Sequence, residues 1–137
     1  MKAKTISGNS PDQLGAALRE CMNDGFRPTL AIVFISVKQD REAISELFRG
    51  ASIDMIGATS AGEFIEDHES GGGIVAMLLD LDKSRYRILF QEIGNHTLQF
   101  AAQMLMERAY ESFANPAFIL LSTYHSEQGT TIDGESL

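Results

Sequence analysis

The sequence predicts an α/β domain with a mixed, mainly parallel sheet, flanking helices and one antiparallel hairpin. Two observations support this fold class. Apolar runs rich in β-branched residues, typical of buried strands, alternate with amphipathic segments that carry helix-capping residues. Over residues 1–60 the order is strand, helix, strand, helix, strand, which favours parallel neighbours joined by right-handed crossovers.

A short strand and a capped helix are predicted at the start of the chain. Ala3–Ser7 can form the strand. Ser10 suits the N-cap, Pro11 suits the first helical position, and Gln13 can complete a capping box. Apolar residues then recur at helical spacing, and Gly25 suits the C′ position that ends the helix. The residues of this apolar stripe are Leu14, Ala17, Leu18, Cys21 and Met22.

The run Thr29–Val37 is predicted to be a central strand buried on both faces, because it lacks alternation and is rich in β-branched residues. Asp40 can cap the helix that follows, and Gly50 can end it. The apolar stripe of this second helix consists of Ile44, Leu47 and Phe48. We then expect Ile53–Ala58 to form a short strand near the middle of the sheet.

A Gly-rich segment and a hairpin are predicted next. Residues 57–73 hold five glycines and no helical stripe, so we expect a long loop, which in a compact domain is often functional. Ile74–Leu81 and Arg85–Ile93 are predicted strands. Because only the three residues 82–84 separate these strands, the pattern indicates an antiparallel hairpin.

A third helix and a last strand are predicted near the end of the sequence. Thr97 opens the helix, and Asn115-Pro116 ends it. Its apolar stripe consists of Leu98, Ala101, Ala102, Leu105, Ala109 and Phe113. The apolar run Ala117–Tyr124 is then expected to be another buried strand.

Charge and composition narrow the class of function. The 19 acidic and 11 basic residues give a net charge of −8, which phosphate backbones and anionic membranes repel, so no nucleic-acid partner is expected. One cysteine, Cys21, excludes an internal disulfide and any cysteine-cluster metal site. No apolar signal core follows Met1, and no apolar run approaches the ~20 residues of a membrane span. We therefore expect one cytoplasmic domain over residues 1–137.

The densest concentration of chemistry-bearing residues is Gly57–Phe64. Its small residues let backbone N–H groups approach a ligand, and Thr59 and Ser60 add hydroxyl groups. The segment follows a predicted strand, and open α/β sheets bind ligands at the carboxyl ends of strands. The alternative is a tight turn that needs Gly57 and Gly62 for its conformation.

A serine hydrolase is a second alternative. Residues 58–62 approach the nucleophile-elbow pattern, and Asp80 or Asp82 and then His125 follow Ser60 in hydrolase order. However, an elbow leads directly into a helix, and no helical pattern follows here. Asp67-His68-Glu69 favours a solvated loop over a metal site, because adjacent ligands on one element point apart.

Gly57–Phe64 resembles the hallmark segment of the FIST N-terminal domain family, named for F-box and intracellular signal transduction proteins. The opening residues 1–8, the apolar strand Leu30–Ile35 and the closing stretch Thr131–Glu135 are similar too. The resemblance covers essentially the whole chain. It also implies an incomplete, truncated member, because full members continue past the Asp-Gly-Glu stretch.

The resemblance implies a non-enzymatic sensory module that binds a small ligand, with amino acids as the proposed class. Such modules act beside output domains such as histidine kinases or chemotaxis receptors. No cofactor and no metal are expected. From the position of the motif we expect the ligand to contact Thr59, Ser60, Ala61, Gly62 and Glu63. A face left open by a missing companion domain can also pair with a second copy, which makes a homodimer a further expectation.

Overall fold

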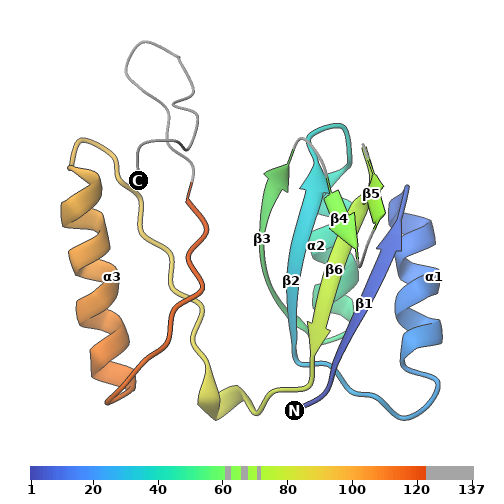
Figure 1. The fold of residues 1–137 in the computed structure, drawn as a ribbon, viewed down its shortest axis with the longest axis horizontal. Helices are drawn as coiled ribbons and strands as arrows, with labels where there is room; N and C mark the ends of the chain where they lie inside the picture. Colours follow the sequence, from blue (N-terminus) through green and yellow to red (C-terminus); the bar gives the residue numbers. More distant parts are fainter. Residues whose placement is uncertain (61–62, 66–67, 71, 123–137) are drawn as a thin grey trace.

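The computed structural model (Figure 1) describes residues 1–60, 63–65, 68–70 and 72–122. The elements are, in chain order, β1 Ala3–Gly8, α1 Pro11–Cys21, β2 Leu30–Ser36, α2 Arg41–Gly50, β3 Asp54–Ser60, β4 Glu63–Ile65, β5 His68–Ser70, β6 Ile74–Leu79, the 3₁₀ helix η1 Lys83–Arg85, and α3 Leu98–Ser112.

Strands β1, β6, β2 and β3 form one sheet in that spatial order. β2 and β3 are parallel, and β6 is antiparallel to both of its neighbours, β1 and β2. Three of these strands therefore run in one direction and β6 runs in the other, which confirms the predicted α/β class with a mixed sheet. β3 lies at the edge of the four strands, so the expectation that it lies near the middle is wrong.

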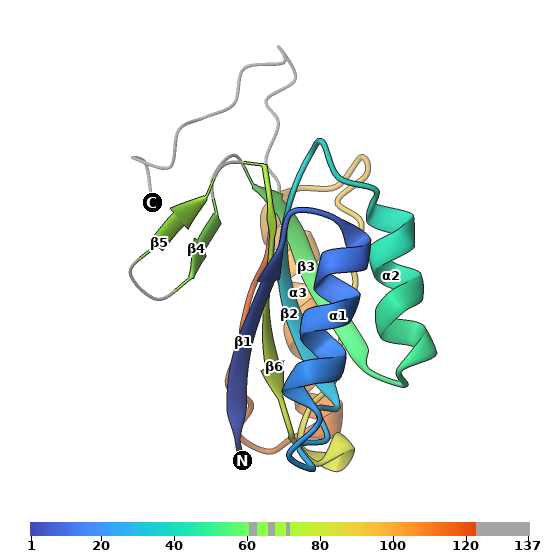
Figure 2. The same cartoon turned by 90° about the vertical axis from the view of Figure 1, so that its right-hand side faces the viewer.

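Helices α1 and α2 cover one face of the sheet (Figure 2). Alternate residues of β2 point into this layer, and Ala31, Val33 and Ile35 are all buried. Burying one large aliphatic or aromatic side chain contributes roughly 1.5–3 kcal/mol to stability. The layer between the helices and the sheet contains the core cluster, so its apolar contacts stabilise the fold. The core cluster consists of Ile6, Leu14, Leu18, Phe26, Ala31, Val33, Ile35, Ile44, Phe48, Ile53, Ile74, Ala76 and Leu78.

The predicted helix caps are present. Ser10 accepts a hydrogen bond from the Gln13 N–H at 3.2 Å, and Asp40 accepts one from the Ala43 N–H at 3.0 Å. Thr97 caps α3 in the same way. Helix α2 ends at Gly50 as predicted, and the positive φ of 59° that follows it belongs to Ser52.

The second face of the sheet is partly exposed in the described part of the chain. Phe34 is 39% exposed and Met77 is 45% exposed, whereas Leu30 and Val75 on the same face are buried. Strands β4 and β5 form an antiparallel hairpin on this side of the sheet (Figure 2). The long loop expected over residues 57–73 is therefore wrong, because β3 continues through Ser60 and the hairpin follows it.

Residues 85–93 do not form the predicted strand, and the hairpin expected between residues 74–81 and 85–93 is absent from the described chain. Asp82 caps η1 by accepting a hydrogen bond from the Ser84 N–H at 2.8 Å. Residues 85–93 cannot pair with β6, because β1 and β2 already occupy both of its edges.

The buried strand expected over Ala117–Tyr124 is wrong for its described part, residues 117–122, which have no strand pairing. A strand needs a hydrogen-bonded neighbour, and no described segment supplies one here. Phe118, Ile119 and Leu120 are 53%, 64% and 70% exposed. Residues 123–124 lie outside the described residues. Helix α3 lies beyond the β3 edge, away from the sheet (Figure 1).

Candidate functional site

The sequence-predicted ligand residues lie at and after the end of β3. Thr59 is exposed and pairs with Ile35 of β2. The backbone of Ser60 ends β3, and that of Glu63 begins β4, whereas Ala61 and Gly62 lie outside the described residues. The backbone of this segment therefore reaches the carboxyl end of the parallel pair β2–β3, the end at which open α/β sheets bind ligands.

The side-chain amide of Gln39 connects two other loops at this end of the sheet. Its Nε2 donates to the Asn9 carbonyl at 2.8 Å and to the Gly72 carbonyl at 2.8 Å. The Ser36 N–H, at the end of β2, donates to the Gly73 carbonyl at 3.0 Å. The loops after β1, after β2 and before β6 are thus held together at the carboxyl end of β2.

Gly57 has a structural role inside β3. A Cβ atom at this position would lie 2.4 Å from the Val33 carbonyl oxygen of the neighbouring strand, a distance that backbone atoms do not tolerate. The alternative of a tight turn is therefore wrong for Gly57, which permits close strand approach instead. Gly62 lies outside the described residues.

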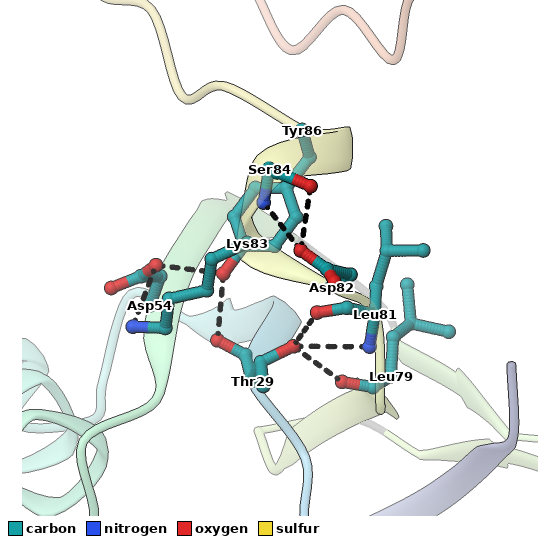
Figure 3. A network of polar contacts seen from close by, with 8 residues as sticks. All are labelled: Thr29, Asp54, Leu79, Leu81, Asp82, Lys83, Ser84 and Tyr86. Atoms are coloured by element: carbon teal, nitrogen blue, oxygen red, sulfur yellow. Dashed lines mark hydrogen bonds and ion pairs between the residues drawn. The ribbon is translucent and has the colours of Figure 1, made fainter.

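A polar cluster occupies the opposite end of the sheet (Figure 3). The Tyr86 hydroxyl lies 2.7 Å from Asp54 Oδ2 and 3.1 Å from the Thr29 carbonyl oxygen. Lys83 Nζ forms an ion pair with Asp54 Oδ2 at 3.2 Å. The Thr29 hydroxyl donates to the Leu81 carbonyl and accepts from the Leu81 N–H at 3.0 Å. These contacts join the starts of β2 and β3 to the chain around η1.

The ionisation of this cluster is perturbed. The hydrogen bond from Tyr86 and the positive charge of Lys83 lower the pKa of Asp54, so its carboxylate remains ionised well below neutral pH. Burial and the adjacent Asp54 carboxylate raise the pKa of Tyr86 to about 12. Asp54 is therefore a charged acceptor and Tyr86 a neutral donor across the physiological pH range.

The sequence interpretation missed this cluster. Arg85–Ile93 was predicted to be a strand, which would have alternated its side chains across two faces of a sheet. The available signal was Asp82-Lys83-Ser84, because an aspartate two residues before a serine N–H can form a local side-chain turn. That signal predicts the turn, but it does not predict the contact with Asp54.

Two hollows flank the Asp54–Lys83 ion pair. The larger, of about 760 Å³, lies between the start of β3, the segment after η1 and the end of α3, and it is lined in part by Met55, Arg87 and Phe113. The smaller, of about 350 Å³, lies toward α2 and includes Arg49. Asp54, Met55 and Lys83 line both hollows.

Comparison with known proteins gives one match. A family model described as FIST N domain matches residues 29–136, which is most of the chain. The chain belongs to the FIST N domain family. No curated protein and no solved structure matches it. The matched residues of this FIST domain include the segment Gly57–Phe64 and the residues that line both hollows. The strand β1 precedes them, yet it pairs with β6 and contributes Ile6 to the same core.

The topology of the FIST domain separates the residues of the hydrolase alternative. Ser60 pairs with Ser36 at the end of β2, whereas Leu79 pairs with Leu30 at its start. Asp80 directly follows Leu79 and therefore lies about one strand length from the Ser60 backbone, roughly 20 Å for seven residues.

Each predicted hydrolase acid also has a local partner at that far end. Asp80 accepts a hydrogen bond from the Lys2 N–H, and Asp82 accepts hydrogen bonds from Ser84. Neither carboxylate can orient a histidine at Ser60. His125 lies outside the described residues. A triad of Ser60 and His125 with either of these acids is therefore contradicted.

Cys21 packs against the core as predicted, and burial raises the pKa of its thiol. Among the described residues, no group of three or more His, Cys, Asp or Glu side chains could hold a metal ion. No helix in the same part of the chain is long and apolar enough to cross a membrane.

Proposed function

We propose that this FIST domain is a cytoplasmic, non-enzymatic sensor of intracellular signal transduction whose ligand is an amino acid or a closely similar molecule. Family membership supports the sensory role. The observation that supports the ligand site is the end of β3 at Ser60, which lies at the carboxyl end of the only parallel strand pair in the described sheet.

The residues of the β3–β4 connection match the chemistry of an amino acid. The ligand carboxylate needs hydrogen-bond donors, which the backbone N–H groups at Ala61 and Gly62 and the hydroxyls of Thr59 and Ser60 can supply. The ligand ammonium group needs an acceptor, and Glu63 supplies a negatively charged one. In this proposal the small side chains leave the backbone accessible to the ligand.

The proposed output passes through the β4–β5 hairpin. This hairpin follows the proposed site directly, and β4 contacts both β2 and β6. A ligand bound to the β3–β4 connection favours one position of the hairpin against the sheet, because it interacts differently with each position. The partner that reads this change is a signalling output domain such as a histidine kinase or a chemotaxis receptor.

A thermal-shift screen of the full chain with amino acids and related metabolites tests the proposal. A ligand that binds only the native state at one hundred times its Kd stabilises that state by about 2.7 kcal/mol, which raises the melting temperature. We expect a shift with one or a few related amino acids. Equal melting temperatures across the set, at concentrations up to the millimolar range, would contradict amino-acid sensing.

A further inference from the structure

We propose that the 760 Å³ hollow between β3, η1 and α3 is a second binding site, which takes a small monoanion: a carboxylate attached to an apolar body. The hollow lies at the start of β3, whereas the proposed amino-acid site lies at its end. Its volume falls in the range of about 300–1,000 Å³ that is typical of small-molecule sites. The proposed ligand is an apolar monoanion and not an amino acid, and it binds at the other end of β3. The proposal therefore does not depend on the sensory function.

The charges that line the hollow favour an anion. Asp54 contributes one negative charge, and Lys83 and Arg87 contribute two positive charges, so the lining carries 2 − 1 = +1. The chain as a whole carries −8, so the positive charge of this lining contrasts with the net charge of the molecule. One net positive charge matches one ligand carboxylate.

Arg87 is the residue available to bind that carboxylate. The charge of Asp54 is already compensated by the Tyr86 hydroxyl at 2.7 Å and by Lys83 at 3.2 Å. The exposed Arg87 side chain, in contrast, forms no hydrogen bond or ion pair with any residue that the structure describes. A guanidinium group can hold a carboxylate through two parallel hydrogen bonds.

The remaining walls suit an apolar ligand body. Met55 and Phe113 are partly buried, and Ile88 is 41% exposed. Contact with a ligand removes this apolar surface from water, which favours binding. The carbonyl end of α3, near Ser112, adds a partial negative charge of about 0.5, but the full positive charge of Arg87 is larger.

Calorimetric titration of the full chain with benzoate, and with benzamide as its neutral counterpart, tests the site. We expect benzoate to bind at least about tenfold more tightly than benzamide, because only benzoate offers a charged acceptor to Arg87. R87Q should weaken benzoate binding by about tenfold or more and leave benzamide binding unchanged. The amide NMR signals of residues 84–88 should shift with benzoate.

R85Q is the matched control. It removes the same charge two positions away, and Arg85 does not line the hollow. We expect R85Q to retain the benzoate affinity of the wild type within about twofold, because Arg85 does not line the hollow and so forms no hydrogen bond with the ligand carboxylate. Equal loss in R85Q and R87Q would overturn the site. So would equal affinity for benzoate and benzamide, or no benzoate binding by the wild-type chain.

Discussion

The Tyr86 hydroxyl donates a hydrogen bond to the Asp54 carboxylate across 2.7 Å, between residues 32 positions apart in the sequence. The hydroxyl has one proton, and its other neighbour, the Thr29 carbonyl oxygen, lies at 3.1 Å. The hydroxyl directs its hydrogen bond to the carboxylate, because that acceptor is closer and is charged. This contact fixes the path of the chain as it leaves the sheet toward α3, and it forms one wall of the larger hollow.

Removal of the Tyr86 hydroxyl should destabilise the fold by about 1 kcal/mol. Y86F keeps the ring and deletes only the donor. The expected loss is below the range for a fully buried charged hydrogen bond, because the Asp54 side chain is 43% exposed and water can replace the donor. The free energy of unfolding in urea gives the measurement. Tyr110 is 55% exposed, so Y110F serves as the control and should change stability by less than about 0.5 kcal/mol.

The stability contribution of Tyr86 should disappear at high pH. Its pKa is about 12 in the folded state against 10.0 for an ordinary tyrosine, so its contribution is complete below pH 10 and is lost as the pH rises toward 12. The ionised phenolate cannot donate to Asp54 and repels it. Unfolding experiments at pH 8 and pH 11 should show a smaller difference between wild type and Y86F at the higher pH. A difference that grows with pH would contradict this assignment.

Low pH should weaken the hydrogen bond between Tyr86 and Asp54, because it protonates the Asp54 carboxylate. The folded-state pKa of Asp54 lies below its usual value of 3.8, so its contribution is present above that value and is lost as the pH falls through the lower folded-state pKa. D54N mimics the protonated group, because it removes the charge and keeps the shape. We expect wild type and D54N to differ in unfolding free energy at pH 7 and to converge as the pH falls through the folded-state pKa of Asp54.

Substitution of Gly57 should destabilise the sheet by about 1–3 kcal/mol. G57A places a Cβ 2.4 Å from the Val33 carbonyl oxygen, so β3 must move away from β2. Gly50 provides the control, because a Cβ there has nothing within 4 Å and its φ is negative. G50A should be neutral or slightly stabilising in the same urea titration. Equal stability of G57A and wild type would show that the strands separate without cost.

The helices could be predicted because their signals are local. Ser10, Asp40 and Thr97 each accept a hydrogen bond from the N–H three residues later, so the capping residue and the start of the helix are neighbours in sequence. The helical spacing of apolar residues likewise depends on a few consecutive turns. Strands β1, β2, β3 and β6 were also found, because their residue types favour extended structure.

Strand partners could not be predicted in the same way, because pairing joins distant residues. Nothing near Ile74–Leu79 in the sequence shows that β6 lies between β1 and β2. Once it does, residues 85–93 have no partner there, and the chain turns at η1 instead. The apolar residues 117–122 also form no strand: their composition favours one, but a strand needs a hydrogen-bonded neighbour, and they pair with no described strand.

The two candidate sites differ in the same way: one is local in sequence and the other is assembled from distant segments. The Gly57–Phe64 segment is continuous in sequence, so its small and hydroxyl-bearing residues could be recognised directly. The hollow beside Asp54 is assembled from β3, η1 and the end of α3, and no spacing rule relates those segments. Sequence patterns identify a site when one turn contains it, and they miss a site that only the fold assembles.

Neutralisation of Glu63 should weaken amino-acid binding at the proposed β3–β4 site. If Glu63 accepts a hydrogen bond from the ligand ammonium group, E63Q should reduce the binding free energy by roughly 1.5–3 kcal/mol, the range for a hydrogen bond to a charged group. The melting temperature of the protein without ligand should remain nearly unchanged. Calorimetric titration with the amino acid found in the thermal-shift screen, together with a thermal melt of the free variant, measures both quantities.

The exposed Glu20 of α1 gives the control for this loss of charge. E20Q changes the net charge by the same amount as E63Q, away from the β3–β4 connection, so it should retain wild-type affinity. A purely structural role of Glu63 predicts the opposite pattern, in which E63Q lowers the melting temperature of the free protein and leaves the affinity unchanged. Equal weakening in E20Q and E63Q would instead indicate a general effect of charge. Only selective weakening in E63Q is consistent with a direct contact between Glu63 and the ligand ammonium group.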